Sequence, residues 1–241
     1  MTARHANEPQ HPDEVLQRLT ELFAPVRALV LDFDGLLADS EPFHFKAYNQ
    51  AFERYGHSLD PEEYWVEFTS RGTGIQGEIE RHNLQLPVSP DTLRQEKFEA
   101  YSGFCNSGAI PLFPAAQRFL QLAGRHYRLA IASGSWEHDI RAILEHAGAA
   151  GQVQTILGKS PGTRQEKPAP DIFLHAAEEL GLAPAECLVI EDALKGLAAA
   201  RGAGMPCLIV RNPLNLKIDF SGTDLVVPNL ESVVGFLEHK A

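Results

Sequence analysis

The chain has 241 residues, 44% hydrophobic and 22% charged, which is ordinary for a globular protein and argues against a disordered or fibrous one. Its 32 acidic and 21 basic residues give a formal net charge of −11, so nucleic acid and anionic membranes are not expected partners. Three cysteines lack disulfide or zinc spacing, and neither a signal-peptide segment nor 18 uninterrupted apolar residues occur. We therefore expect a soluble, cytoplasmic, monomeric protein.

The first part of the chain predicts a short helix followed by a buried strand. Residues 1 to about 12 are polar, whereas Val15, Leu19 and Phe23 follow helical spacing, so residues 1–24 are expected to form an N-terminal extension with a short helix. The apolar run ALVLDF at 28–33 ends in acidic residues. This pattern is typical of a buried parallel strand whose carboxyl end opens into a site.

Residues 41–110 predict a block of helices. Ser40 and Pro42 mark the start of the first helix, and Gly56 marks its end. Further helices are expected from residue 60, over 75–82 and from residue 89. Because no strand pattern interrupts this stretch, we interpret it as a helical cap domain inserted after the first strand.

Strands and helices alternate from residue 111 to the end of the chain. Strand-like apolar runs occupy 127–133, 153–157, 187–191, 206–210 and 224–227. Helical stretches begin near residues 114, 135, 170, 192 and 230. The alternation predicts an α/β core with a doubly wound, Rossmann-like parallel sheet, made of residues 25–40 and 111–241. Ligands of such sheets bind outside the carboxyl ends of the strands.

Polar residues with related chemistry stand at the expected strand ends and in one loop. Carboxylates from two strand ends share a hard divalent cation, a lysine adds a compact positive charge, and a hydroxyl with nearby N–H groups holds phosphoryl oxygens. The candidates are Asp32, Asp34, Ser133, Lys167, Glu191 and Asp192. Together they predict a phosphoryl-transfer site.

Four segments carry a more specific resemblance. DFDGLLADSEP (32–42), IASGS (131–135), EKPAPDIF (166–173) and VIEDALKGLAAARGAGM (189–205) resemble the four ordered motifs of the haloacid dehalogenase-like superfamily. The resemblance covers about 27–227, and the helical insertion resembles the cap of the beta-phosphoglucomutase-like subfamily. Ala193 stands where many relatives have Ser or Thr, and Gly134-Ser135 also departs from the common pattern. Neither departure removes a group that the mechanism needs.

The resemblance implies a role for each motif residue. Asp32 is the implied nucleophile, which forms an aspartyl phosphate, and Asp34 is the implied proton donor and acceptor. Mg²⁺ is the implied cofactor, held by the carboxylates of Asp32, Glu191 and Asp192 and by the backbone carbonyl of Asp34. The implied phosphate-binding residues are Ser133, Gly134 and Lys167.

Two residues of the expected cap keep two interpretations each. His44 lies 12 positions after Asp32, where the resemblance places a hinge residue near the site, but a packing role fits the sequence equally well. Arg71 stands beside the glycines of 72–77 and is either a clamp on the substrate or, more commonly for such a residue, a surface arginine.

The favoured function is a Mg²⁺-dependent phosphatase of a small phosphorylated metabolite, with a sugar phosphate as the expected class. A sugar phosphomutase would use the same residues and is the first alternative. A non-hydrolytic, phospho-accepting receiver module is an alternative of a different class, because it also combines an Asp, an acidic metal site, a hydroxyl and a Lys. Receivers are about half as long and lack the helical insertion.

Overall fold

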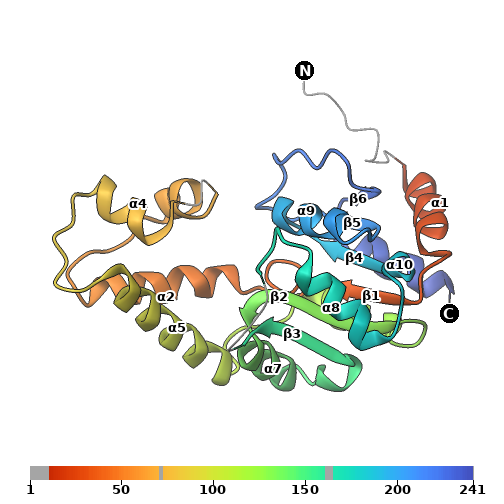
Figure 1. Cartoon of the computed structure of the whole chain (residues 1–241), viewed down its shortest axis with the longest axis horizontal. Helices are drawn as coiled ribbons and strands as arrows, with labels where there is room; N and C mark the ends of the chain where they lie inside the picture. Colours follow the sequence, from red (N-terminus) through yellow and green to blue (C-terminus); the bar gives the residue numbers. More distant parts are fainter. Residues whose placement is uncertain (1–10, 71–72, 161–164, 241) are drawn as a thin grey trace. The chain divides into compact units, whose positions relative to one another are not determined.

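The structure is a computed structural model of the whole chain, and it describes residues 11–70, 73–160 and 165–240 (Figure 1). The chain divides into two compact units. The larger contains Met1–Asp39 and Pro111–Ala241, and the smaller contains Ser40–Ile110. None of the helices among the described residues is long and apolar enough to cross a membrane.

A six-stranded parallel sheet forms the centre of the larger unit and confirms the predicted α/β fold. Its strands are β1 (Ala28–Leu31), β2 (Arg128–Trp136), β3 (Thr155–Lys159), β4 (Cys187–Glu191), β5 (Cys207–Val210) and β6 (Leu225–Val227). Their order is β3-β2-β1-β4-β5-β6. The chain runs outward from β1 to β3 and then starts again on the other side with β4, so the order reverses between β1 and β4. A doubly wound sheet opens its ligand crevice at this switch point.

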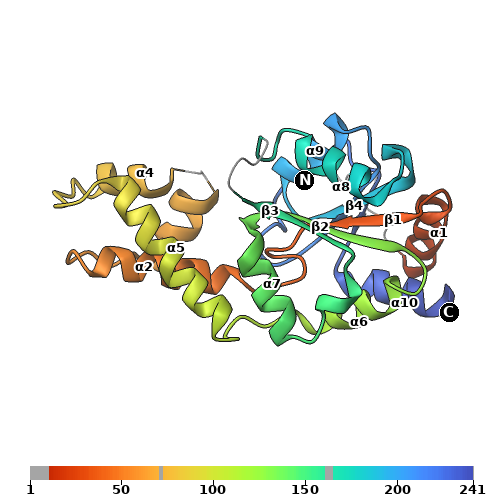
Figure 2. The same ribbon diagram turned by 60° about the horizontal axis from the view of Figure 1, so that its bottom comes forward.

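Helices cover both faces of this sheet. They are α1 (Pro12–Phe23), α6 (Pro114–Ala123), α7 (Glu137–His146), α8 (Asp171–Leu180), α9 (Leu194–Gly202) and α10 (Leu230–Lys240), with 3-10 turns η2 (Ala150–Gln152) and η3 (Pro184–Glu186). In Figure 2, α8 and α9 lie on one face, and α6, α7 and α10 lie on the other. Because both faces are covered, every residue of β1, β4 and β5 is buried, which explains their unbroken apolar runs.

Two helices begin about two residues after the positions near which they were predicted. Strand β2 continues to Trp136 with a register irregularity after Ala132, so Ser135 belongs to the strand and α7 begins at Glu137. The predicted helix near residue 192 begins at Leu194. In both places the backbone is still non-helical at the polar residue that resembles an N-cap, and the helix begins about two residues later.

All regular secondary structure among the described residues of the smaller unit is helical, as predicted. It contains α2 (Glu41–Glu53), α3 (Pro61–Glu63), the π-helical turn η1 (Tyr64–Ser70), α4 (Gly74–Arg81) and α5 (Pro90–Asn106). The Asp60 carboxylate accepts the N–H groups of Glu62 and Glu63 at 2.9 Å each, which caps α3. The unit has its own core, in which Phe52, Tyr64, Phe68 and Leu93 are buried. The π-helical turn has no counterpart in the sequence prediction.

The three cysteines are buried, where a cysteine behaves as a small hydrophobic residue. Burial raises the pKa of the Cys187 thiol to about 11, and the neighbouring Glu186 carboxylate adds to this. Burial likewise raises the pKa of Cys207. These thiols therefore stay protonated and unreactive at neutral pH.

Candidate active site

Asp32 and Asp34 lie where β1 ends. The N–H of Asp32 donates to the carbonyl of Ile190 at 3.0 Å, which extends the β1–β4 ladder by one residue. The chain then turns at Gly35, whose φ is +77°. A Cβ atom on Gly35 would lie 2.8 Å from Asp192 Oδ2. This turn therefore requires glycine both for its backbone conformation and for the close approach of Asp192.

Lys167 joins the ends of β1 and β4. Its Nζ donates to Asp32 Oδ1 at 2.6 Å and to Glu191 Oε1 at 2.7 Å. The side chain of Lys167 is only 4% exposed and that of Glu191 only 1%. The ammonium also lies 4.8 Å from the centre of the Phe173 ring. Residues far apart in the sequence thus meet at one edge of the sheet.

The protonation of this cluster follows from burial and charge. Burial raises the pKa of Asp32 to about 7, with Glu191 adding to the rise and Lys167 opposing it. Burial alone would lower the pKa of Lys167, but the carboxylates of Asp32 and Glu191 outweigh it and raise that pKa above its usual value. The lysine is therefore a fixed cation, and it faces more carboxylate charge than it can neutralise.

The excess negative charge gives the site the character of a cation site. Ligand oxygens of Asp32, Glu191 and Asp192 all lie within 4.8 Å of one another. A set made only of oxygen atoms suits a hard cation such as Mg²⁺ and does not favour softer metals. The residues present therefore fit the cation that the sequence resemblance implies.

Both carboxylate oxygens of Glu191 accept hydrogen bonds. Besides Lys167 on Oε1, its Oε2 accepts the N–H groups of Asp192 at 2.9 Å and Ala193 at 3.0 Å. It also lies against the first turn of α9, where a Cβ atom on Gly196 would come within 1.8 Å of Oε1. Gly196 therefore makes room for the carboxylate that fixes Lys167.

Replacement of Gly196 by alanine is expected to displace Glu191 and, with it, Lys167. Because alanine is the better helix former, the change would be neutral or stabilising on propensity alone. We instead expect a loss of about 2–4 kcal/mol in the free energy of unfolding, because the cluster loses its hydrogen bonds. Urea unfolding measures this loss, and Gly235→Ala in α10 is the control, since its Cβ would meet nothing within 4 Å. Equal stability of the two variants would contradict the expectation.

Asp34 receives two serine hydroxyls. Its Oδ2 accepts Ser133 Oγ at 3.1 Å and Ser135 Oγ at 2.6 Å. Ser133 Oγ in turn accepts the N–H of Ser135 at 3.0 Å, while Gly134 between them is exposed. Alternate residues of an extended segment point to the same side, which explains why both hydroxyls reach one carboxylate. Sequence reasoning missed Ser135, because a serine at this place also reads as a helix cap.

Two asparagines after β5 also belong to the site. Asn212 Nδ2 donates to Asp192 Oδ2 at 2.7 Å and to the Gly35 carbonyl at 3.2 Å. Asn215 Nδ2 donates to the Asp192 carbonyl at 2.9 Å. Both amides hold Asp192 in place. Sequence reasoning missed them as well, although they follow a predicted strand and the same strand-end argument would have found them.

A cavity of about 220 Å³ adjoins Lys167 in the larger unit. Its lining includes Ser133, Gly134, Lys159, Glu166, Lys167 and His175. Lys159 and Glu166 form an ion pair of 2.9 Å across part of this lining. All three predicted phosphate-binding residues, Ser133, Gly134 and Lys167, thus border one space.

The two predicted cap residues have different outcomes. The ring of His44 stacks on Tyr101 with centroids 4.0 Å apart, and its Nδ1 lies 3.0 Å from Lys97 Nζ. These contacts lie inside the smaller unit and agree with the packing interpretation of His44, while its place near the site stays a prediction. Arg71 lies outside the described residues, so its role as a substrate clamp stays a prediction.

Comparison with known proteins gives the family of this chain. A haloacid dehalogenase-like hydrolase model matches residues 26–204. The chain is 32% identical over 219 residues to protein CbbY of Rhodobacter capsulatus, which covers 86% of this chain and 95% of the relative. It is 33% identical over 183 residues to fructose-1-phosphate phosphatase YqaB of Escherichia coli K12, which covers 76% of this chain and 95% of the relative.

A solved structure agrees with these sequence matches. The crystal structure of CbbY from Rhodobacter sphaeroides in complex with phosphate is 27% identical, with a TM-score of 0.73 over 88% of this chain and 99% of the other. The family match covers most of the larger unit and the whole helical block. The chain therefore belongs to the haloacid dehalogenase-like hydrolase family, and it is an enzyme of the phosphatase type.

Proposed function

We propose that this chain is a Mg²⁺-dependent phosphatase that hydrolyses a small phosphorylated sugar through an aspartyl phosphate on Asp32. The observation that carries the proposal is the ion cluster in which Lys167 Nζ lies 2.6 Å from Asp32 Oδ1 and 2.7 Å from Glu191 Oε1. The names of the relatives support the substrate class. YqaB is named a fructose-1-phosphate phosphatase, and a CbbY mutant has been crystallised with xylulose-1,5-bisphosphate.

The carboxylates of Asp32, Glu191 and Asp192, with the backbone carbonyl of Asp34, would hold the metal ion. When bound, Mg²⁺ supplies positive charge to the phosphoryl oxygens in a protein whose net charge is −11. Asn212 orients Asp192 through its bond of 2.7 Å to Oδ2. Such hydrogen bonds to metal-binding carboxylates tune affinity in other metal sites.

The residues of the chain then perform two steps. The Asp32 carboxylate attacks phosphorus, and the leaving sugar oxygen takes a proton from Asp34. Asp34 next accepts a proton from the water that attacks the aspartyl phosphate, which releases inorganic phosphate and restores both carboxyl groups. Lys167 neutralises Asp32 and, with Ser133 and the backbone at Gly134, binds the phosphoryl oxygens. Ser135 helps to hold the Asp34 carboxyl through its bond of 2.6 Å.

An assay of phosphate release tests this proposal. With Mg²⁺ present, fructose 1-phosphate and related sugar phosphates are expected to release inorganic phosphate with multiple turnovers. EDTA is expected to reduce the rate at least about 100-fold, because the charge on the phosphoryl oxygens is then uncompensated. Addition of Mg²⁺ alone should restore the rate. Turnover that continues in EDTA would overturn the metal assignment.

Two other outcomes separate the alternatives. Conversion of beta-glucose 1-phosphate without free phosphate, in the presence of a trace of the bisphosphate, would identify a phosphomutase. A receiver module would not sustain turnover of para-nitrophenyl phosphate, and the hydrolase match over residues 26–204 already favours the enzyme. A cytoplasmic location and a monomeric state stay predictions, which fractionation and sedimentation can test.

A further inference from the structure

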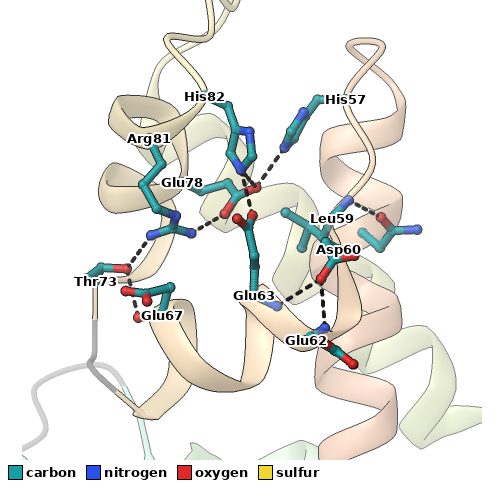
Figure 3. A network of polar contacts seen from close by, with 11 residues as sticks. His57, Leu59, Asp60, Glu62, Glu63, Glu67, Thr73, Glu78, Arg81 and His82 are labelled. Carbon is teal, nitrogen blue, oxygen red and sulfur yellow. Dashed lines mark hydrogen bonds and ion pairs between the residues drawn. The ribbon is translucent and has the colours of Figure 1, made fainter.

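A second group of metal-binding side chains lies in the smaller unit, apart from the phosphatase residues. His57 Nε2 is 2.7 Å from Glu78 Oε1. His82 Nε2 is 3.4 Å from the same oxygen and 2.8 Å from Glu63 Oε2. Figure 3 shows both imidazoles directed at these carboxylates. Ligand atoms of His57, Glu78 and His82 all lie within 4.8 Å of one another.

Three segments bring this His/Glu cluster together. Glu78 and His82 are four residues apart on α4 and at its C-cap, which places them on one side of the helix. Glu63 ends α3, and His57 follows Gly56, whose φ of +80° turns the chain after α2. The cluster therefore joins the segment after α2, the end of α3 and the end of α4.

Glu78 is fixed by other residues. Its side chain is 2% exposed, and its second oxygen, Oε2, accepts a hydrogen bond from Arg81 Nη2. Arg81 Nη1 also donates to Thr73 Oγ1 at 3.0 Å, and Thr73 Oγ1 donates to the Glu67 carbonyl at 2.8 Å. This chain of contacts leaves Oε1 facing the two histidines (Figure 3). Outer partners of this kind are what orient the ligands of metal sites.

We propose that His57, Glu63, Glu78 and His82 bind a divalent transition metal ion, with Zn²⁺ as the best fit. Two imidazole nitrogens and two carboxylate oxygens form the mixed, four-membered set that suits tetrahedral zinc, whereas Mg²⁺ and Ca²⁺ prefer oxygen alone. In the metal-bound state each imidazole keeps its proton on Nδ1 and offers the Nε2 lone pair to the metal.

The observed distances among His57, Glu78 and His82 need only small changes for such binding, whereas Glu63 contacts His82 but lies outside the group within 4.8 Å and must move further. Metal–ligand bonds of about 2.0–2.1 Å in a tetrahedron place ligand atoms about 3.3 Å apart. The 3.4 Å separation of His82 and Glu78 already agrees with this, while the two hydrogen-bonded pairs at 2.7 and 2.8 Å must open by about half an ångström. His82 and Glu63 are 35% and 42% exposed, so they have room to move and leave a path from solvent.

Metal analysis tests the site in the full-length chain. We would strip the protein with a chelator, return it to excess Mg²⁺ and measure Zn²⁺ binding by equilibrium dialysis. The variants are His57→Gln/His82→Gln, and His126→Gln as the matched control, since His126 is an exposed histidine of the larger unit. Asp192→Asn weakens the site of Asp32, Glu191 and Asp192, so that Zn²⁺ bound there can be distinguished from Zn²⁺ bound at the His/Glu cluster.

The wild type, His126→Gln and Asp192→Asn are each expected to retain a Zn²⁺ ion that the double variant binds at least about 100-fold more weakly. Saturating Zn²⁺ should also raise the melting temperature of the wild type by about 2–8 °C, and leave that of the double variant unchanged. If the double variant does not fold, Glu63→Gln replaces it, with an expected loss of about 10-fold or more. No Zn²⁺ binding by the wild type, or equal binding by the ligand variants, would overturn the proposal.

Discussion

Replacement of Asp32 by asparagine is expected to lower the rate of phosphate release at least about 10⁴-fold, because an amide does not attack phosphorus as a carboxylate does. The fold should survive. Asparagine has nearly the same shape, and its carbonyl oxygen can still accept the hydrogen bond that Lys167 Nζ makes at 2.6 Å. Lys167 also keeps Glu191 as its charged partner at 2.7 Å. Steady-state phosphate release measures the activity, and circular dichroism measures the fold.

The control for this variant is Asp13→Asn, the same substitution at an exposed position of α1. Its rate of phosphate release should stay within about twofold of the wild-type rate, since substitution of an exposed residue outside the site has little effect on folding or activity. If Asp32→Asn retains more than about a hundredth of the wild-type rate after deamidation has been excluded by mass spectrometry, Asp32 is not the nucleophile. A second acidic residue at the sheet edge would then have to be sought.

The convergence of Asp32 and Glu191 could be predicted because it depends on a general property of parallel sheets. Strands β1 and β4 lie next to each other in the same direction, so polar residues at their ends share one edge. The unbroken apolar runs of these strands fixed their positions in the sequence. The hydrogen-bond partners of each carboxylate were harder to predict from the sequence, because they depend on the exact length of each strand and on the path of the loop that follows it.

Ser135 illustrates this limit. The sequence around it fits both the end of a strand and the start of a helix, and only the irregular pairing between β2 and β3 keeps it extended, where it reaches Asp34. Asn212 and Asn215 carry no charge, so they did not stand out beside the acidic residues that they orient. The contact of His44 with Lys97 joins residues 53 positions apart in the sequence, so no local sequence pattern could have predicted it.

Replacement of Lys167 by methionine is expected to affect both activity and stability. Without the ammonium, the buried carboxylates of Asp32 and Glu191 face each other with no cation, since methionine fills the space but offers no charge. The loss of one partner from a buried ion cluster costs about 3–5 kcal/mol of unfolding free energy. The rate of phosphate release should fall at least about 10³-fold, because the phosphoryl oxygens lose a fixed charge.

Urea unfolding in EDTA and in saturating Mg²⁺ separates the two effects of Lys167. In EDTA the full loss of stability should appear. Mg²⁺ should stabilise the methionine variant more than the wild type, because a divalent cation at Asp32, Glu191 and Asp192 then compensates the carboxylates that the lysine no longer serves. Lys217→Met, at an exposed lysine of the same unit, should unfold like the wild type in both conditions. If Mg²⁺ reduces the difference in unfolding free energy between Lys167→Met and the wild type but phosphate release stays absent, Lys167 has a direct part in phosphoryl transfer. If Mg²⁺ leaves this difference unchanged, the three carboxylates do not share an ion.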